Sequence, residues 1–237
     1  MVAIQLGFDV VSDLRLVVRI GGSIVASPLN PALMNRYAKL LQDLKRQGHE
    51  VAAVVGGGSL SRQLIQTAKA MGLSEPHQDE VAISISRVMA QLLALRVGEA
   101  SSLTQPTTIE DAASLLQKGK IVIMGGLKPG MTTDTVAALL AAHVNADLLV
   151  KATDQEGIYN RDPRKFPDTH KLDSLSFNDL SNLFETNKHK AGIHQVIDPE
   201  AVRILQKSKI KTVIVNGSKP ENVFSAVKGE KIGTMIS

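Results

Sequence analysis

The sequence predicts a single α/β domain, in which a mainly parallel β-sheet lies between two layers of helices. Short runs of β-branched and aliphatic residues alternate along the chain with segments whose apolar residues recur at the helical spacing of 3.6 residues. Glycine-rich turns end several of the runs. The 237 residues, 43% of them hydrophobic, suffice for one sizeable core, and no linker or internal repeat divides them.

The first predicted unit is a strand, a glycine turn and a helix. Leu14–Ile20 is the strand, and Gly21-Gly22-Ser23 ends it. Pro31–Gln47 follows with apolar residues on one helical face, and Gly48 supplies the stop signal.

The same arrangement recurs twice in the middle of the chain. Glu50–Val55 is a strand, Gly56-Gly57-Gly58 is its turn, and Ser59 is a candidate N-cap for the next helix. Further on, we expect helices at Val81–Val97 and Ile109–Gln117, a strand at Ile121–Met124, a loop at 125–131, and the helix Thr135–His143, opened by Thr132-Thr133-Asp134.

The C-terminal part begins with a strand at Ala146–Ala152 and a polar stretch that predicts a loop or small hairpin. The remaining predicted elements are helices at Phe177–Glu185, Pro199–Ser208 and Pro220–Val227, and strands at Thr212–Val215 and Thr234–Ile236.

Composition excludes several classes of function. The chain has no cysteine, which excludes disulfides, thiolate metal sites and a cysteine nucleophile. Its apolar runs are shorter than the roughly 20 residues of a membrane helix, and Met1 to Leu14 lacks the basic start of a secretory signal. We therefore expect a soluble, cytoplasmic protein without a membrane partner, in which residues 1–14 form a short extension or an edge segment.

The charge balance favours a small anionic ligand over a nucleic acid. Lys and Arg number 27 against 23 Asp and Glu, but five Phe, two Tyr and no Trp give little material for stacking bases. The six histidines show no spacing typical of a metal site, so we expect no metal held by a cluster of protein side chains.

Three glycine-bearing turns are the best candidates for a ligand site: Gly21-Gly22-Ser23, Gly56-Gly57-Gly58 and the segment 125–134. Each follows a predicted strand, and the carboxyl ends of parallel strands meet at one edge of the sheet, where glycine amides can approach phosphate oxygens. The alternative is that each is an ordinary tight turn, since neither the P-loop nor the dinucleotide-binding fingerprint occurs.

Arg62 and Asp134 stand beside these turns. Arg62 lies one turn into the helix after Gly58, where it can fold back toward a bound anion or simply be exposed. Asp134 lies in the first turn of its helix, where a carboxylate complements the helix dipole and Thr133 is a candidate cap. The neighbouring loop, which contains Lys128, favours a ligand-binding role instead.

The motifs fall in a definite order along the chain. They are Ile20-Gly21-Gly22-Ser23, Val54-Val55-Gly56-Gly57-Gly58, Thr132-Thr133-Asp134 with Ala137-Ala138-Leu139-Leu140-Ala141, Ala146-Asp147-Leu148-Leu149-Val150-Lys151-Ala152-Thr153, Gly157-Ile158-Tyr159 and Asp162-Pro163. Together, from about Leu14 to the C-terminus, they resemble the amino acid kinase family, and within it the uridylate (UMP) kinases of archaeal type.

The resemblance implies an α/β/α sandwich that transfers the γ-phosphoryl group of ATP to UMP with Mg²⁺, giving UDP and ADP for pyrimidine nucleotide biosynthesis. It also implies a homohexamer. Residues of about 15–150 would form the half for UMP binding and phosphoryl transfer, and residues of about 151–237 the half for the ATP nucleoside.

The resemblance further implies roles for individual residues. The catalytic candidates are Arg19, Arg62 and Asp134, with Asp134 organising cations rather than acting as a base, because a phosphate monoester is already ionised at pH 7. Expected on the ATP side are Gly21, Gly22, Ser23, Gly58, Arg62, Thr153, Tyr159 and Asp162. Expected on the UMP side are Gly57, Asp79 at the ribose, Leu127, Lys128, Pro129, Gly130, Met131, Thr132 and Thr133.

The chain departs from the family pattern in two places, and other activities compete. Arg19 stands where many relatives have Lys, and Gln155-Glu156-Gly157 stands where relatives commonly have Val-Asp-Gly. Isopentenyl phosphate kinase is the first rival, although the expected histidine after the second glycine turn is absent from Ser59-Leu60-Ser61-Arg62. A kinase for carboxylates, a nucleotide sensor or a storage protein on the same scaffold are further alternatives.

Overall fold

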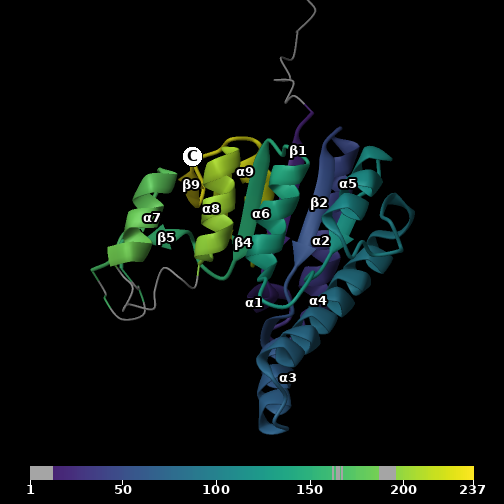
Figure 1. Cartoon of the computed structure of the whole chain (residues 1–237). Coiled ribbons are helices and arrows are strands. Elements are labelled where there is room, and N and C mark those ends of the chain that lie inside the picture. Colours follow the sequence, from purple (N-terminus) through teal and green to yellow (C-terminus); the bar gives the residue numbers. More distant parts are fainter. Residues whose placement is uncertain (1–12, 162, 164–165, 167, 187–195) are drawn as a thin grey trace, which may run out of the picture.

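The structure is a computed structural model that describes residues 13–161, 163, 166, 168–186 and 196–237. A seven-stranded sheet with the order β3-β2-β1-β4-β8-β9-β7 runs through the molecule (Figure 1). All neighbouring strands are parallel except β8 and β9. These strands are β1 (Arg15–Ile20), β2 (Glu50–Val55), β3 (Val122–Met124), β4 (Leu148–Thr153), β7 (Ser174–Leu175), β8 (Thr212–Asn216) and β9 (Thr234–Ile236).

Helices cover both faces of the sheet and bury two apolar clusters against it, which confirms the predicted α/β/α class. One face carries α1 (Gly22–Val25), α2 (Pro31–Arg46), α4 (Glu75–Val97) and α9 (Glu221–Val227). The other carries α5 (Ile109–Gln117), α6 (Thr133–His143), α7 (Phe177–Thr186) and α8 (Pro199–Ser208).

The alternating burial explains why these runs form strands. In β1, Leu16, Val18 and Ile20 belong to one apolar cluster and Val17 to the other, since successive side chains of a strand point to opposite faces. All six residues of β4 are buried, as expected for a central parallel strand.

Helix ends follow the capping signals in the sequence. The Asn30 side chain accepts a hydrogen bond from the Leu33 amide and Pro31 occupies the first turn of α2. Gly48 follows that helix with a φ of +98°, which favours glycine. Asp198 caps α8 in the same way, by accepting from the Ala201 amide.

Three predicted helix starts were wrong. Ser59 is not an N-cap, because α3 (Gly58–Ala70) already begins at Gly58, with Gly57 as its N-cap and no side-chain hydrogen bond there. Helix α4 begins at Glu75 rather than at Val81. The prediction missed its first turns because they are polar and show no apolar periodicity, although Pro76 is a signal for a helix start there. The cap of α6 is Thr132 and not Thr133, since the Thr132 hydroxyl accepts from the amides of Asp134 and Thr135.

Helices α3 (Gly58–Ala70) and the first half of α4 project beyond the carboxyl end of the sheet (Figure 1). The short 3₁₀ helix η1 (Gly98–Ala100) follows α4. Glu75–Ala100 is long and apolar enough, by length and composition, to span a membrane, although no continuous apolar run marks it. A core helix of a soluble protein meets the same criterion, and Met89, Leu93 and Val97 lie in the core.

The polar stretch after β4 forms the small hairpin that was one of its two predicted forms. Strands β5 (Ile158–Tyr159) and β6 (Lys171–Leu172) pair antiparallel there. The two-residue edge strand β7 was not predicted, since a segment so short has no measurable period.

The order of strands in the sheet reverses at β1, which pairs with β2 on one side and with β4 on the other. Such a reversal is the usual place for a ligand cleft in an open α/β sheet.

Candidate functional site

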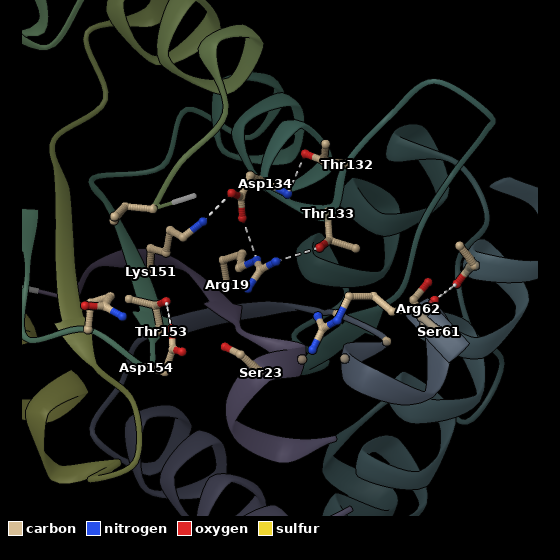
Figure 2. Close-up of a pocket in the computed structure, with 18 of the residues that line it drawn as sticks. Arg19, Ser23, Ser61, Arg62, Thr132, Thr133, Asp134, Lys151, Thr153 and Asp154 are labelled. Atoms are coloured by element: carbon tan, nitrogen blue, oxygen red, sulfur yellow. Dashed lines mark hydrogen bonds and ion pairs between the residues drawn. The ribbon is translucent and has the colours of Figure 1, made fainter. Parts of the chain in front are cut away.

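A cavity of about 780 Å³ opens at the carboxyl ends of β1, β2 and β4. Figure 2 shows side chains from several elements pointing into it. Its walls come from the glycine turns after β1 and β2, the loop before α6, helices α3 and α4, the end of β4 and the hairpin strand β5. The expectation that the glycine turns converge on one cleft is therefore confirmed.

The first two glycine turns touch each other through their backbones. A Cβ atom on Gly22 would lie 2.2 Å from the Gly58 amide nitrogen, and one on Gly58 would lie 2.4 Å from the Gly22 oxygen. Gly58 also has a φ of +65°, which other residues adopt at a cost. Neither position can carry a side chain, so the amides of both turns stay close to any ligand between them.

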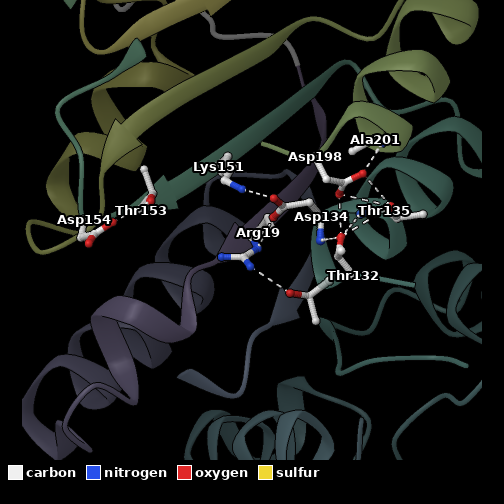
Figure 3. A network of polar contacts seen from close by, with 10 residues as sticks. Arg19, Thr132, Asp134, Thr135, Lys151, Thr153, Asp154, Asp198 and Ala201 are labelled. Atoms are coloured by element: carbon white, nitrogen blue, oxygen red, sulfur yellow. Dashed lines mark hydrogen bonds and ion pairs between the residues drawn. The ribbon is translucent and has the colours of Figure 1, made fainter. Parts of the chain in front are cut away.

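Three charges, one buried and two partly buried, meet at the floor of the cavity (Figure 3). The Asp134 carboxylate lies between Arg19 and Lys151: its Oδ1 is 2.6 Å from Arg19 Nε, and its Oδ2 accepts a hydrogen bond from Lys151 Nζ. The side chains are 15%, 12% and 4% exposed for Arg19, Asp134 and Lys151. Arg19 Nη2 also donates to Thr133 Oγ1 at 2.9 Å. We call Arg19, Asp134 and Lys151 the charged triad.

Strand pairing creates the charged triad. Arg19 of β1 and Lys151 of β4 are direct partners in the register of the two parallel strands, so two cations lie side by side. Like charges in that position are destabilising. Asp134, which enters from the first turn of α6, compensates for their repulsion.

The electrostatics of the triad depend on burial. Burial would raise the pKa of Asp134, but the charges of Arg19 and Lys151 outweigh this effect and hold that pKa below its usual value. Burial lowers the pKa of Lys151 to about 8, against the opposing effect of Asp134. The Lys151 ammonium therefore loses its proton closer to neutral pH than an exposed lysine does.

The triad also retains unused hydrogen-bonding capacity. Arg19 Nε and Asp134 Oδ1 are close enough for an ion pair, but among the described residues neither atom makes a hydrogen bond that meets the usual geometry. Buried polar atoms without hydrogen-bond partners are uncommon in native structures, and a catalytic role is one of the explanations for them.

Asp198 holds the start of α6 in place. Its Oδ2 accepts from Thr132 Oγ1 at 2.6 Å, and its Oδ1 accepts from Thr135 Oγ1 at 3.0 Å (Figure 3). The same Oδ1 caps α8 through the Ala201 amide at 2.9 Å. The N-termini of α6 and α8 are thus joined by one carboxylate, and Asp134 lies in the segment that it fixes.

Arg62 and Asp79 lie on the side of the cavity formed by α3 and α4. Arg62 is exposed, and its Nη2 has one weak contact, at 3.3 Å, with Ser27 Oγ. In Figure 2 it reaches into the cavity from the side opposite Lys151. Asp79 Oδ2 accepts from the Gly130 amide at 2.7 Å, which links α4 to the loop before α6.

Most of the other predicted site residues line the cavity and some do not. The lining includes Gly22, Ser23, Gly57, Gly58, Met131, Thr132, Thr133, Thr153 and Tyr159. Gly21, Leu127, Lys128, Pro129 and Gly130 are not part of it. The Gly21 amide donates to the Ala152 oxygen of β4 instead of facing the cavity. Asp162 lies outside the described residues.

Lys151 and Asp198 are the functional candidates that the sequence reasoning missed. Lys151 is the single charge in the buried run Leu148–Thr153, and a charge in such a strand was a usable signal. Asp198 precedes Pro199 and is recognisable as a helix cap, but its contact with α6 has no local signature. Within the described part of the chain, no group of three His, Asp or Glu side chains is placed to hold a metal ion.

Comparison with known proteins gives a consistent result. Residues 14–216 match the family model described as "Amino acid kinase family". The chain is 40% identical over 226 residues to a uridylate kinase of Methanocaldococcus jannaschii, which covers 94% of this chain and 99% of that one. It is 39% identical over 219 residues to a uridylate kinase of Methanococcoides burtonii, with 92% and 93% coverage.

Solved structures agree. The crystal structure of uridylate kinase from Archaeoglobus fulgidus superposes with a TM-score of 0.86 at 35% identity, covering 94% of this chain and all of that one. A UMP kinase from Bacillus anthracis has a TM-score of 0.80 at 20% identity, which supports the fold alone.

Proposed function

The chain belongs to the amino acid kinase family, and from this premise we infer that it is an ATP-dependent UMP kinase. It transfers the γ-phosphoryl group of ATP to UMP and yields UDP and ADP. The observation that carries this conclusion is the charged triad at the floor of the cavity, in a chain 35–40% identical over almost its whole length to archaeal uridylate kinases.

The charged triad suits phosphoryl transfer. This reaction requires alignment of the two substrates and neutralisation of the charge on the transferred group, with little covalent work for the protein. We propose that Arg19 and Lys151 contact the transferred group and that Asp134 holds these two cations in position. The UMP phosphate needs no general base, because it has already lost its protons at pH 7.

Arg62 completes the arrangement in this proposal. It faces the cavity from α3, opposite Lys151, and only a weak contact restrains it. A guanidinium so placed can contact phosphate oxygens of either substrate as they approach. The transferred group would then have cations on two sides.

The two ends of the cavity suit two nucleotides. We propose that Gly57, Asp79 and the loop Leu127–Thr133 bind UMP, with Asp79 at the ribose; the part of this loop that lines the cavity is Met131–Thr133. We propose that the turn Gly21–Ser23, Gly58, Thr153, Tyr159 and Asp162 bind ATP. The chain would thus be one domain, with UMP and the transferred group in residues of about 15–150 and the ATP nucleoside in residues of about 151–237.

Mg²⁺ is the cofactor that we propose to accompany ATP. Magnesium is commonly held by substrate phosphates, water and one or two carboxylates, so an all-protein cage is not required. Asp154 lines the cavity, and its described contact is with Thr153 Oγ1 at 3.2 Å, so it is free to hold the ion or a water on it. The ion would neutralise part of the triphosphate charge.

We also propose that the protein is a cytoplasmic homo-oligomer, a homohexamer by family resemblance, with no nucleic-acid or membrane partner. One feature favours self-association. Val88, Leu92 and Leu95 form an apolar stripe along α4 and are 48%, 51% and 56% exposed. Light scattering on the purified protein tests the oligomeric state.

A coupled assay for ADP release tests the proposed activity. The acceptors are UMP, CMP, dUMP, AMP and isopentenyl phosphate, each with and without Mg²⁺. UMP with Mg²⁺ should give the highest kcat/KM. A preference of about tenfold or more for isopentenyl phosphate or any other non-pyrimidine acceptor would overturn the proposal.

A further inference from the structure

The loop at 125–131 between β3 and α6 is held from one side by a single helix. It contains no regular structure, and its backbone is bound by three side chains of α4. The Gly130 amide donates to Asp79 Oδ2 at 2.7 Å, and the Gly126 amide donates to Ser86 Oγ at 2.8 Å. We call residues 125–131 the acceptor loop, following the proposed function.

Arg87 makes the most constrained of these contacts. Its Nε donates to the Gly126 oxygen and its Nη2 donates to the Leu127 oxygen, both at 2.9 Å. The planar guanidinium therefore holds two consecutive carbonyl groups at once, a geometry that a lysine ammonium cannot reproduce. Among the described residues, no acidic side chain pairs with Arg87, so these carbonyls are its partners.

The approach of the acceptor loop to α4 is as close as backbone permits. A Cβ atom on Gly125 would lie 2.6 Å from the Arg87 amide nitrogen, and one on Gly126 would lie 3.1 Å from Ile83 Cγ1. The loop therefore rests directly on the helix. The three polar side chains, at 79, 86 and 87, lie on the side of α4 that faces it.

Arg87 lies behind the acceptor loop and not in the cavity. Asp79, Ser86 and Gly126 line the cavity, and Arg87 does not. Arg87 is half-buried, and its guanidinium donates to two carbonyl oxygens of the acceptor loop. Its effect on a bound substrate can pass only through the position of the loop.

We propose that Arg87 is a positioning residue for the phosphoryl acceptor: it fixes the backbone of the acceptor loop from behind and so sets the affinity for UMP. This inference rests on the proposed function for the identity of the acceptor. It differs from that function in naming a residue that touches neither nucleotide.

The test compares Arg87→Ala and Arg87→Lys with Arg96→Ala. Arg96 is a matched control, because it lies on the same helix and its Nε donates to Asn35 Oδ1, away from the acceptor loop. Loss of two charge-assisted hydrogen bonds should raise KM for UMP by about tenfold or more in Arg87→Ala, with KM for ATP changed by less than about twofold. Arg87→Lys should fall between, because an ammonium can restore one carbonyl contact.

Hydrogen exchange measured without any nucleotide supplies a second readout. Amides of residues 125–131 should exchange faster in Arg87→Ala than in Arg96→Ala, while amides of the β1 turn remain as in the unsubstituted protein. Faster exchange together with an acceptor other than UMP would support the positioning role and overturn the proposed function. Unchanged loop exchange, or equal increases of KM for both substrates, would overturn the positioning role.

Discussion

A network of paired charged side chains lies at each end of strands β1 and β4. The two networks differ in how far they are buried. At the amino end, the Arg15 side chain pairs with Glu50 and donates to the Val144 oxygen, and the Arg15 amide donates to Asp147 Oδ2 at 2.7 Å. The Arg15 and Glu50 side chains are 36% and 39% exposed. At the carboxyl end, the charged triad is almost excluded from solvent.

The difference shows how the same residue types serve two purposes. Exposed ion pairs gain little energy because water screens them, so the amino end joins neighbouring elements at small cost. The charged triad keeps two adjacent cations and unmatched polar atoms beside a cavity, where charge interactions are strong. Function is therefore expected at one end of the strands, and only a contribution to stability at the other.

The largest effect is expected for Asp134→Asn. The amide keeps the volume but leaves Arg19 and Lys151 facing each other without a counter-charge. We expect kcat to fall by about 10²- to 10³-fold and the free energy of unfolding to fall by about 3 kcal/mol. Glu50→Gln at the amino end is the control and should retain kcat, with a loss below about 1 kcal/mol. An active, stable Asp134→Asn enzyme would remove the contrast between the two ends.

Arg62→Ala should lower kcat by about 10²-fold without changing the melting temperature. Arg62 is exposed and has one weak contact, so its removal breaks no packing. Arg46→Ala is the matched control, because it also removes an exposed arginine, but from α2 and away from the cavity. If Arg62→Ala retains full kcat, the transferred group has its cations on one side only.

A smaller and graded effect is expected from pH. The pKa of Lys151, lowered to about 8 by burial, places its deprotonation within the range of an activity assay. Because kcat/KM reports groups in the free enzyme, its value for ATP should fall above about pH 8, by about tenfold for each further pH unit. In Lys151→Arg that decline should disappear from the range below pH 10, since a guanidinium does not titrate there. A flat profile in the unsubstituted enzyme would contradict a requirement for the Lys151 charge.

The smallest effect concerns His49 at the amino end, whose Nδ1 accepts from the Leu14 amide at 3.1 Å. Burial lowers its pKa below the ordinary value of 6.5, so the unfolded chain binds the proton more readily. The contribution of His49 to stability is then fully present above pH 6.5 and is lost as pH falls from 6.5 toward the lower folded pKa. We expect this loss to lower Tm by less than about 3 °C, and His49→Gln to lose this part of the pH dependence. A change of kcat in His49→Gln would contradict the separation of the two ends.

Most of the fold could be predicted from the sequence because its elements have local causes. Helix α2 carries a cap, a proline and an apolar stripe, and β2 is a continuous aliphatic run between a polar residue and three glycines. Each signal lies within the element it defines. The start of α4 was misplaced because its first two turns project beyond the sheet and need no apolar face.

The site could be predicted only in part. The glycine turns are visible as local patterns, and Asp134 stands beside one of them in the sequence. The partnership of Lys151 with Arg19 depends on the register between β1 and β4, and the contact of Asp198 with Thr132 depends on how α6 packs on α8. Neither contact leaves a recognisable pattern in the sequence, because each joins residues that are far apart in it.

The position of β4 beside β1 has a consequence for how the polypeptide is made. Arg19 leaves the ribosome early, whereas its neighbour Lys151 follows only after β2, β3 and α6. Asp134 lies between them in the order of synthesis, so its negative charge is available to Arg19 before the second cation arrives. A nascent chain thus need not bring two unscreened cations together when β4 docks, because Asp134 is already available to Arg19 when Lys151 arrives beside it.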